Sequence, residues 1–284
     1  MTAATSRRRF LILALVGIIG GVLSGAFGVG GGIVMVPLLV WLAGMDQKIA
    51  SATSLAAIVP ATIVGSVAYI LHNQVDLTAA LALAVGAVPG ALIGTWLLRR
   101  INIDILRWLF IVLMLAVAVR MVFLEVERGA EIDQNVATIA ILVGVGLLTG
   151  IASGLFGVGG GVIMVPVLVV GFGMGDLIAK GTSLVAMIAS STVGTASNIR
   201  AKKVDWKAGL IVGVAATLFS YAGVALALIM SPRVSSVLFA ALLFLAAGQL
   251  IVRTLRQRRT VKVVEDPAPA ATENATAPES DTTR

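Results

Sequence analysis

The stretch SGAFGVGGGIVMVPLLV, residues 24–40, places five glycines and one proline in an otherwise apolar segment. It returns as SGLFGVGGGVIMVPVLV at residues 153–169, with 13 of 17 positions identical and an offset of 129. The same offset aligns the tripeptide TSL at 53–55 with TSL at 182–184, without a gap. The chain therefore consists of two homologous halves, and each carries the same glycine-rich interruption.

The composition is that of a membrane protein. Of the 284 residues, 58% are hydrophobic and 12% are charged, and the mean hydropathy is +1.03. Soluble domains carry roughly 25% charged residues. Apolar runs of about 20 residues recur along the chain, so we expect an all-α polytopic protein in the lipid bilayer with about eight transmembrane segments. The net charge of +7 lies in short clusters at the ends of these runs, and no nucleic-acid partner is indicated.

Each half is expected to form a glycine-broken helical hairpin followed by three spanning helices. A continuous helix over residues 10–44 would be about 52 Å long, against a hydrocarbon core of about 30 Å. This segment must therefore fold back, as two short helices or as a re-entrant hairpin tipped by the glycines. The predicted elements are 10–44 with its break, 49–71, 77–98 and 104–124, then 134–173 with its break, 177–199, 207–229 and 234–252.

The positions of lysine and arginine predict the orientation. Basic clusters place both termini, and the loops near residues 100 and 203, in the cytoplasm, whereas the loops at 72–77 and 120–133 read as external. The two halves are then inverted-topology repeats. We expect a cytoplasmic N-terminus at 1–9, repeat 1 at 10–125, an external linker at 126–133, repeat 2 at 134–255 and a disordered cytoplasmic tail at 256–284. Residues 6–26 resemble a signal peptide, but its cleavage would destroy one copy of the repeat.

The glycine motifs indicate an anion site. Backbone groups freed inside a bilayer must face protein or a water-filled cavity, and a helix N-terminus attracts negative charge. Other glycines, such as Gly17, Gly21 and Gly90, are expected only to pack helices closely. Substrate-binding residues are predicted to be Gly28, Gly30, Gly31, Gly32, Gly157, Gly159, Gly160 and Gly161, with Pro37 and Pro166 breaking the following helices.

Hydroxyl groups follow each motif at the start of the next helix. Thr53, Ser54, Thr182 and Ser183 could bond anion oxygens, but N-capping or interhelical hydrogen bonding explains them equally well. Further hydroxyls that could line the pathway are Thr62, Ser66, Ser190, Ser191, Thr192 and Thr195.

Charge is expected to be absent from the depth of the spans. A buried carboxylate would mark a proton relay or a cation site, so its absence argues against a carrier of metal cations and leaves proton coupling without a carrier. No catalytic residues, metal ligands or cofactors are predicted, and the chain has no cysteine.

The doubled SGxFGVGGGxxMVPxL motif with its following TSL resembles the TauE/SafE family of sulfite exporters, over roughly residues 12–250. The resemblance implies a secondary transporter in the inner (cytoplasmic) membrane, usually an exporter, of small sulfur-containing anions such as sulfite, thiosulfate or organosulfonates. Alternating access between repeats is the expected mechanism.

A channel-like anion facilitator, or a carrier of another small organic anion, is the alternative, because no coupling acid is evident. A membrane enzyme or scaffold is disfavoured, since no reactive constellation is present. A homodimer is kept as a hypothesis for the assembly.

Overall fold

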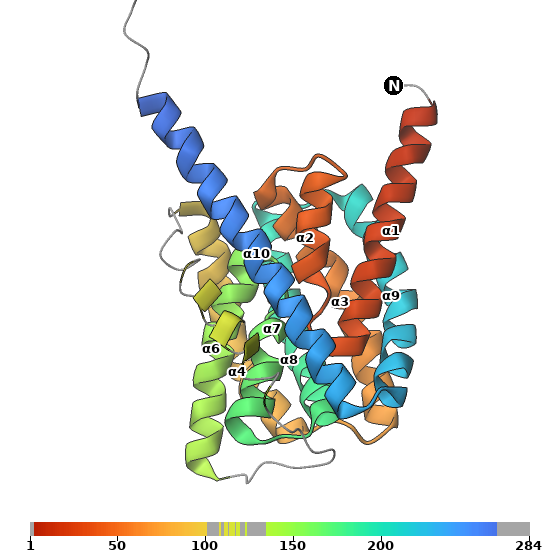
Figure 1. The fold of residues 1–284 in the computed structure, drawn as a ribbon, viewed down its shortest axis with the longest axis vertical. Coiled ribbons are helices and arrows are strands. Elements are labelled where there is room, and N and C mark those ends of the chain that lie inside the picture. The colour runs from red at the N-terminus through yellow and green to blue at the C-terminus, as the bar shows by residue number, and fades with distance from the viewer. Residues whose placement is uncertain are drawn as a thin grey trace, which may run out of the picture.

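The computed structural model describes residues 3–100 and 135–265, with scattered positions between 108 and 123. Every regular element in these ranges is helical (Figure 1). The helices are α1 (Ala3–Phe27), α2 (Gly32–Trp41), α3 (Gln47–Leu71), α4 (Leu77–Arg100), α6 (Val136–Phe156), α7 (Gly161–Pro166) with the π-helical turn η1 (Val167–Gly171), α8 (Asp176–Arg200), α9 (Trp206–Ile229) and α10 (Pro232–Glu265). Most of the predicted span at 104–124, and the linker at 126–133, lie outside the described residues.

Seven of the described helices are long and apolar enough to cross a membrane: α1, α3, α4, α6, α8, α9 and α10. The all-helical, multi-pass prediction is confirmed. Helix α10 continues to Glu265 and so includes residues 256–265, which we expected in the tail. These residues contain good helix formers and no glycine or proline, and the next proline is Pro267.

Both predicted breaks are present. Helix α1 ends at Phe27 and α2 begins at Gly32, while α6 ends at Phe156 and α7 begins at Gly161. The arms of each hairpin are unequal, which differs from the first of the two expected forms, a pair of short helices. The apolar part of α1 has 21 residues, so at 1.5 Å per residue it is about 32 Å long and can cross a bilayer alone. Only the second arm is short, with 10 residues in α2.

The strongest packing joins helices of different repeats. Helix α1 packs along α9, α6 packs along α4, and α3 and α8 contact each other as well as α9 and α4 respectively. Two equivalent bundles result: bundle A contains α1, α2, α3 and α9, and bundle B contains α6, α7, α8 and α4. Each bundle holds one helix, α9 or α4, contributed by the other repeat.

Glycines explain how closely these helices approach. A Cβ atom on Gly21 would lie 2.3 Å from the carbonyl oxygen of Ala216 in α9, and one on Gly150 would lie 2.3 Å from that of Ala87 in α4. Only glycine fits against a backbone at this distance. The packing role predicted for Gly17, Gly21 and Gly90 is confirmed, because Gly17 and Gly90 meet backbone carbonyls in the same way.

Candidate functional site

The two breaks require glycine for their backbone conformation. The N-cap residues of the short helices, Gly31 and Gly160, have φ of +70° and +90°, in the left-handed region that other residues avoid. Neither N-cap offers a side chain to the first-turn N–H groups of its helix. The remaining positive φ values in the breaks belong to Gly28, Gly30, Gly157 and Gly159.

The first break (residues 28–32) and the second break (residues 157–161) contact each other directly. A Cβ atom on Gly32 would lie 2.4 Å from the carbonyl oxygen of Gly157, and one on Gly161 would lie 2.2 Å from that of Gly28. The offset of 129 converts the first contact into the second. The short helices α2 and α7 therefore begin at one shared point in the core, with their positive ends there.

Serine hydroxyls tie each break to the opposite repeat. Ser54 Oγ donates to the carbonyl oxygen of Gly157 at 2.7 Å, and Ser183 Oγ donates to that of Gly28 at 2.8 Å. These four residues form an equivalent pair of contacts. Both carbonyls lie in breaks, where the regular helical pattern that would satisfy them stops.

Threonine hydroxyls form a second reciprocal pair. Thr53 Oγ1 accepts from the backbone N–H of Asp205 at 3.0 Å, and Thr182 Oγ1 accepts from that of Asp76 at 2.9 Å. The Asp205 and Asp76 side chains in turn accept from N–H groups in the first turns of α9 and α4. All four hydroxyls at the start of α3 and α8 therefore make hydrogen bonds between the repeats. Their binding of an anion stays a prediction.

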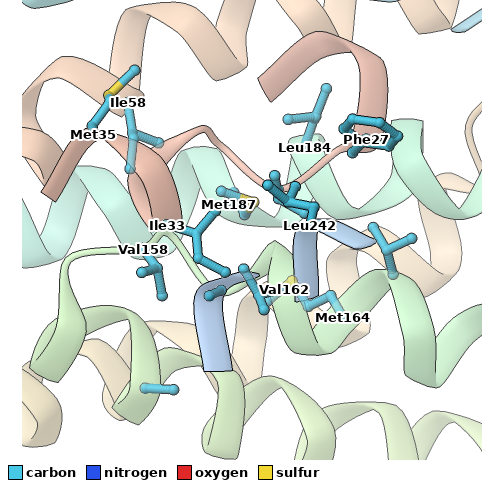
Figure 2. Packing of buried hydrophobic residues seen from close by; sticks show 14 of the residues in the cluster. Phe27, Ile33, Met35, Ile58, Val158, Val162, Met164, Leu184, Met187 and Leu242 are labelled. Atoms are coloured by element: carbon cyan, nitrogen blue, oxygen red, sulfur yellow. The ribbon is translucent and has the colours of Figure 1, made fainter. Parts of the chain in front are cut away.

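Two apolar side chains fill the point where the breaks meet. The methyl group of Met187 lies 2.2 Å from the Cβ positions that Gly30 and Gly159 would have, and Ile58, its equivalent in α3, lies beside both of these glycines. Both side chains are fully buried. Figure 2 shows Ile58 and Met187 beside Ile33, at the start of α2, and Val158 of the second break. This centre is closed and apolar in the structure.

A cavity of about 30 Å³ lies beside the second break, which is room for about two water molecules. It is lined by Ile33, Val36, Pro37, Gln47, Phe156, Val158, Ala246, Gln249 and Leu250. Pro37 lines this cavity and lies inside α2, which continues through it to Trp41. Its equivalent Pro166 ends α7 where the π-helical turn begins. Just before the first break, Phe27, the equivalent of Phe156, contacts Phe239 of α10, and the ring centroids lie 5.7 Å apart.

The other predicted hydroxyls serve mainly their own helices. Those of Thr62, Ser66, Ser190, Ser191 and Thr192 donate to carbonyls three or four residues earlier. Thr195 Oγ1 is buried with no hydrogen-bond partner. None of these bonds reaches the meeting point of the breaks.

One charged pair is buried inside the protein at the start of α8. Asp176 and Lys180 are 3% and 2% exposed. Lys180 Nζ lies 3.2 Å from Asp176 Oδ2 and donates to Ser235 Oγ at 2.6 Å. An acidic and a basic residue four apart share a helix face, so the signal was present, but charges at the ends of apolar runs are usually solvated.

The family model for the sulfite exporter TauE/SafE matches residues 2–121 and 142–278. The chain is 27% identical over 220 residues to the probable membrane transporter protein YunE of Bacillus subtilis, covering 69% of this chain and 81% of the relative. It is 32% identical over 190 residues to a probable membrane transporter protein of Xylella fastidiosa, covering 64% and 71%. No solved structure matches the chain.

Proposed function

The chain belongs to the sulfite exporter TauE/SafE family of membrane transporters, and on this basis we propose that it exports small sulfur-containing anions, sulfite first, by alternating access. The observation that carries the proposal is the direct contact between the two glycine breaks. Each break starts a helix without a side-chain cap, so two positive helix ends converge between repeats. Sites of this kind suit anionic groups.

A carrier is favoured over an open channel. The meeting point of the breaks is filled by Ile58 and Met187, and the cavity beside the second break is lined by Phe156 and Val158 among others. An anion on that side would reach the centre only after these side chains move. Such a barrier fits a transport cycle with an occluded state.

We further propose that the repeats are inverted in the cytoplasmic membrane, with both termini inside. The N-terminal end of α1 and the C-terminal end of α10 lie at the same end of the molecule (Figure 1). Arg9 forms an ion pair with Asp205 at 3.1 Å, which holds the N-terminal arm beside the basic loop near residue 203. The positive-inside rule assigns this end to the cytoplasm.

Reconstituted protein tests the function. Proteoliposomes loaded with sulfite should release it faster than liposomes that contain no protein. They should also exchange internal sulfite for external sulfite. Accumulation of sulfite against its own gradient, driven by an imposed ion gradient, distinguishes a carrier from a facilitator. Failure to move sulfite, thiosulfate and sulfoacetate, alongside movement of a carboxylate, would contradict the proposed substrate class.

Valine at Gly160 tests the site. A Cβ atom there lies 3.1 Å from its nearest neighbour, so Gly160→Val changes the break with less clash than Gly31→Val, whose Cβ would lie 2.0 Å from a backbone oxygen. We expect Gly160→Val to abolish sulfite flux while the protein still inserts. Gly144→Val is the matched control, because Gly144 is exposed and has nothing within 4 Å of its Cβ position.

A further inference from the structure

The ion pair at the start of α8 is buried, in contrast to the exposed Arg9–Asp205 pair. Lys180 and Asp176 are 2% and 3% exposed, and the ammonium group also reaches Ser235 at the start of α10. Taking two charges out of water costs several kcal/mol per ion, and ionisable groups inside membrane proteins usually serve function.

The backbone of Lys180 packs against the first break. A Cβ atom on Gly28 would lie 2.7 Å from Lys180 Cα, so the two backbones touch. Ser183 Oγ donates to the carbonyl oxygens of both Gly28 and Lys180. The Lys180 side chain points from this contact toward the N-terminal turn of α8, where Asp176 lies one turn before it.

The fold does not require these charges. The offset of 129 places Gln47 and Ser51 at the equivalents of Asp176 and Lys180. Ser51 packs on the second break as Lys180 packs on the first, because a Cβ atom on Gly157 would lie 2.6 Å from Ser51 Cα. One repeat therefore makes this contact with neutral residues. The charged pair is a specific feature of the other repeat.

We propose that Lys180 is the fixed positive charge that binds the anionic group of the transported substrate, on the first-break side of the core. A sulfur oxyanion accepts hydrogen bonds at several oxygens and takes the place of the Asp176 carboxylate on the ammonium group. Asp176 holds that group while the site is empty. Ser235, whose hydroxyl already accepts a hydrogen bond from Lys180, lies beside the same ammonium group. This inference rests on the proposed function.

The test replaces the two charged residues of repeat 2 with the neutral residues at the equivalent positions of repeat 1. The double variant Asp176→Gln/Lys180→Ser copies Gln47 and Ser51, so we expect it to insert and fold. Without the charge-assisted bond, sulfite should bind about tenfold or more weakly, because such a bond is about twice as strong as a neutral one. Binding is measured as stabilisation of the purified protein against heating in sulfite, with chloride at matched ionic strength. Lys48→Ser is the control, since it removes an exposed positive charge near the start of α3.

Two further variants separate binding from structure. Lys180→Arg should keep most of the sulfite affinity, and Asp176→Asn should raise it, because the competing carboxylate is gone. A purely structural ion pair predicts that both lose stability and neither changes the affinity. Unchanged sulfite affinity in the double variant, or no stabilisation of the unaltered protein by sulfite, overturns the assignment. Flux in proteoliposomes is scored separately, so sulfite transport that is insensitive to Lys180 refutes this inference and leaves the proposed function standing.

Discussion

Alanine at Gly31 should destabilise the protein more than alanine at its equivalent, Gly160. Both residues are N-caps with positive φ, and a non-glycine residue in this region costs about 1–2 kcal/mol. Their surroundings differ. A Cβ atom on Gly31 would lie 2.0 Å from the carbonyl oxygen of Gly20 in α1, whereas one on Gly160 has its nearest neighbour, Thr149 O, at 3.1 Å.

The clash at Gly31 is difficult to relieve because α1 also packs closely against α9. Gly21, next to Gly20, already approaches the backbone of α9 so closely that its own Cβ would lie 2.3 Å from Ala216 O. Moving α1 away from α2 therefore pushes it into α9. Overpacking of this kind costs about 1–3 kcal/mol, which brings the expected loss for Gly31→Ala to about 2–5 kcal/mol with the backbone strain.

Gly44→Ala provides the reference for strain alone. Gly44 has φ of +65°, and nothing lies within 4 Å of its Cβ position. Its substitution should cost only the conformational term of about 1–2 kcal/mol, and Gly160→Ala about 1–3 kcal/mol, since one neighbour must shift slightly. The free energies of unfolding are compared by titrating the three variants with a denaturing detergent in mixed micelles. If Gly31→Ala proves no less stable than Gly44→Ala, the close contact between α1 and the first break does not exist as described.

Three other outcomes are expected. Ser54→Ala and Ser183→Ala should each cost about 0.6–1.7 kcal/mol in the same titration, because each removes one hydroxyl donor from a carbonyl in a break; equal stability to the unaltered protein would contradict the reciprocal bonds. Met187→Ala should cost about 2–5 kcal/mol and raise passive sulfite flux in proteoliposomes, since its methyl group fills the point where the two breaks meet. The chain has no cysteine, so the double variant Ala57→Cys/Gly213→Cys introduces a single pair of thiols. These should form a disulfide, because the Cβ positions lie 3.8 Å apart, and the disulfide should leave sulfite flux intact. Flux that returns only on reduction of the disulfide would contradict this expectation.

The breaks and the helix limits were predictable because their causes are local. Glycine and proline interrupt an apolar run within a few residues, and the spans at 49–71 and 207–229 agree with α3 and α9 to within two residues. The meeting of Gly32 with Gly157 is a contact between segments 125 residues apart. The repeat made such a contact plausible, but no residue pattern specified which carbonyl each glycine would face.

For the hydroxyls and the ion pair, the sequence did not reveal which partner each side chain contacts. Thr53 and Ser54 were equally compatible with a ligand and with a partner helix, and only the positions of Asp205 and Gly157 reveal the bonds that they make. Lys180 lies near a helix end, where a lysine usually reaches solvent. Its burial depends on α10, since Ser235 accepts its hydrogen bond. Neither relation can be read from a spacing along the chain.

The packing also changes which parts can move against each other. If whole repeats rocked, α1 would slide along α9 and α6 along α4, and these are the most extensive helix interfaces among the described residues, with glycines packed against backbone carbonyls. Extensive interfaces between close-packed backbones resist sliding. We expect the moving bodies to be bundle A and bundle B, which meet through α3, α8 and the two breaks. Ala57 and Gly213 belong to different repeats but to the same bundle, so a disulfide between them distinguishes the two motions: it blocks the rocking of repeats and permits the rocking of bundles.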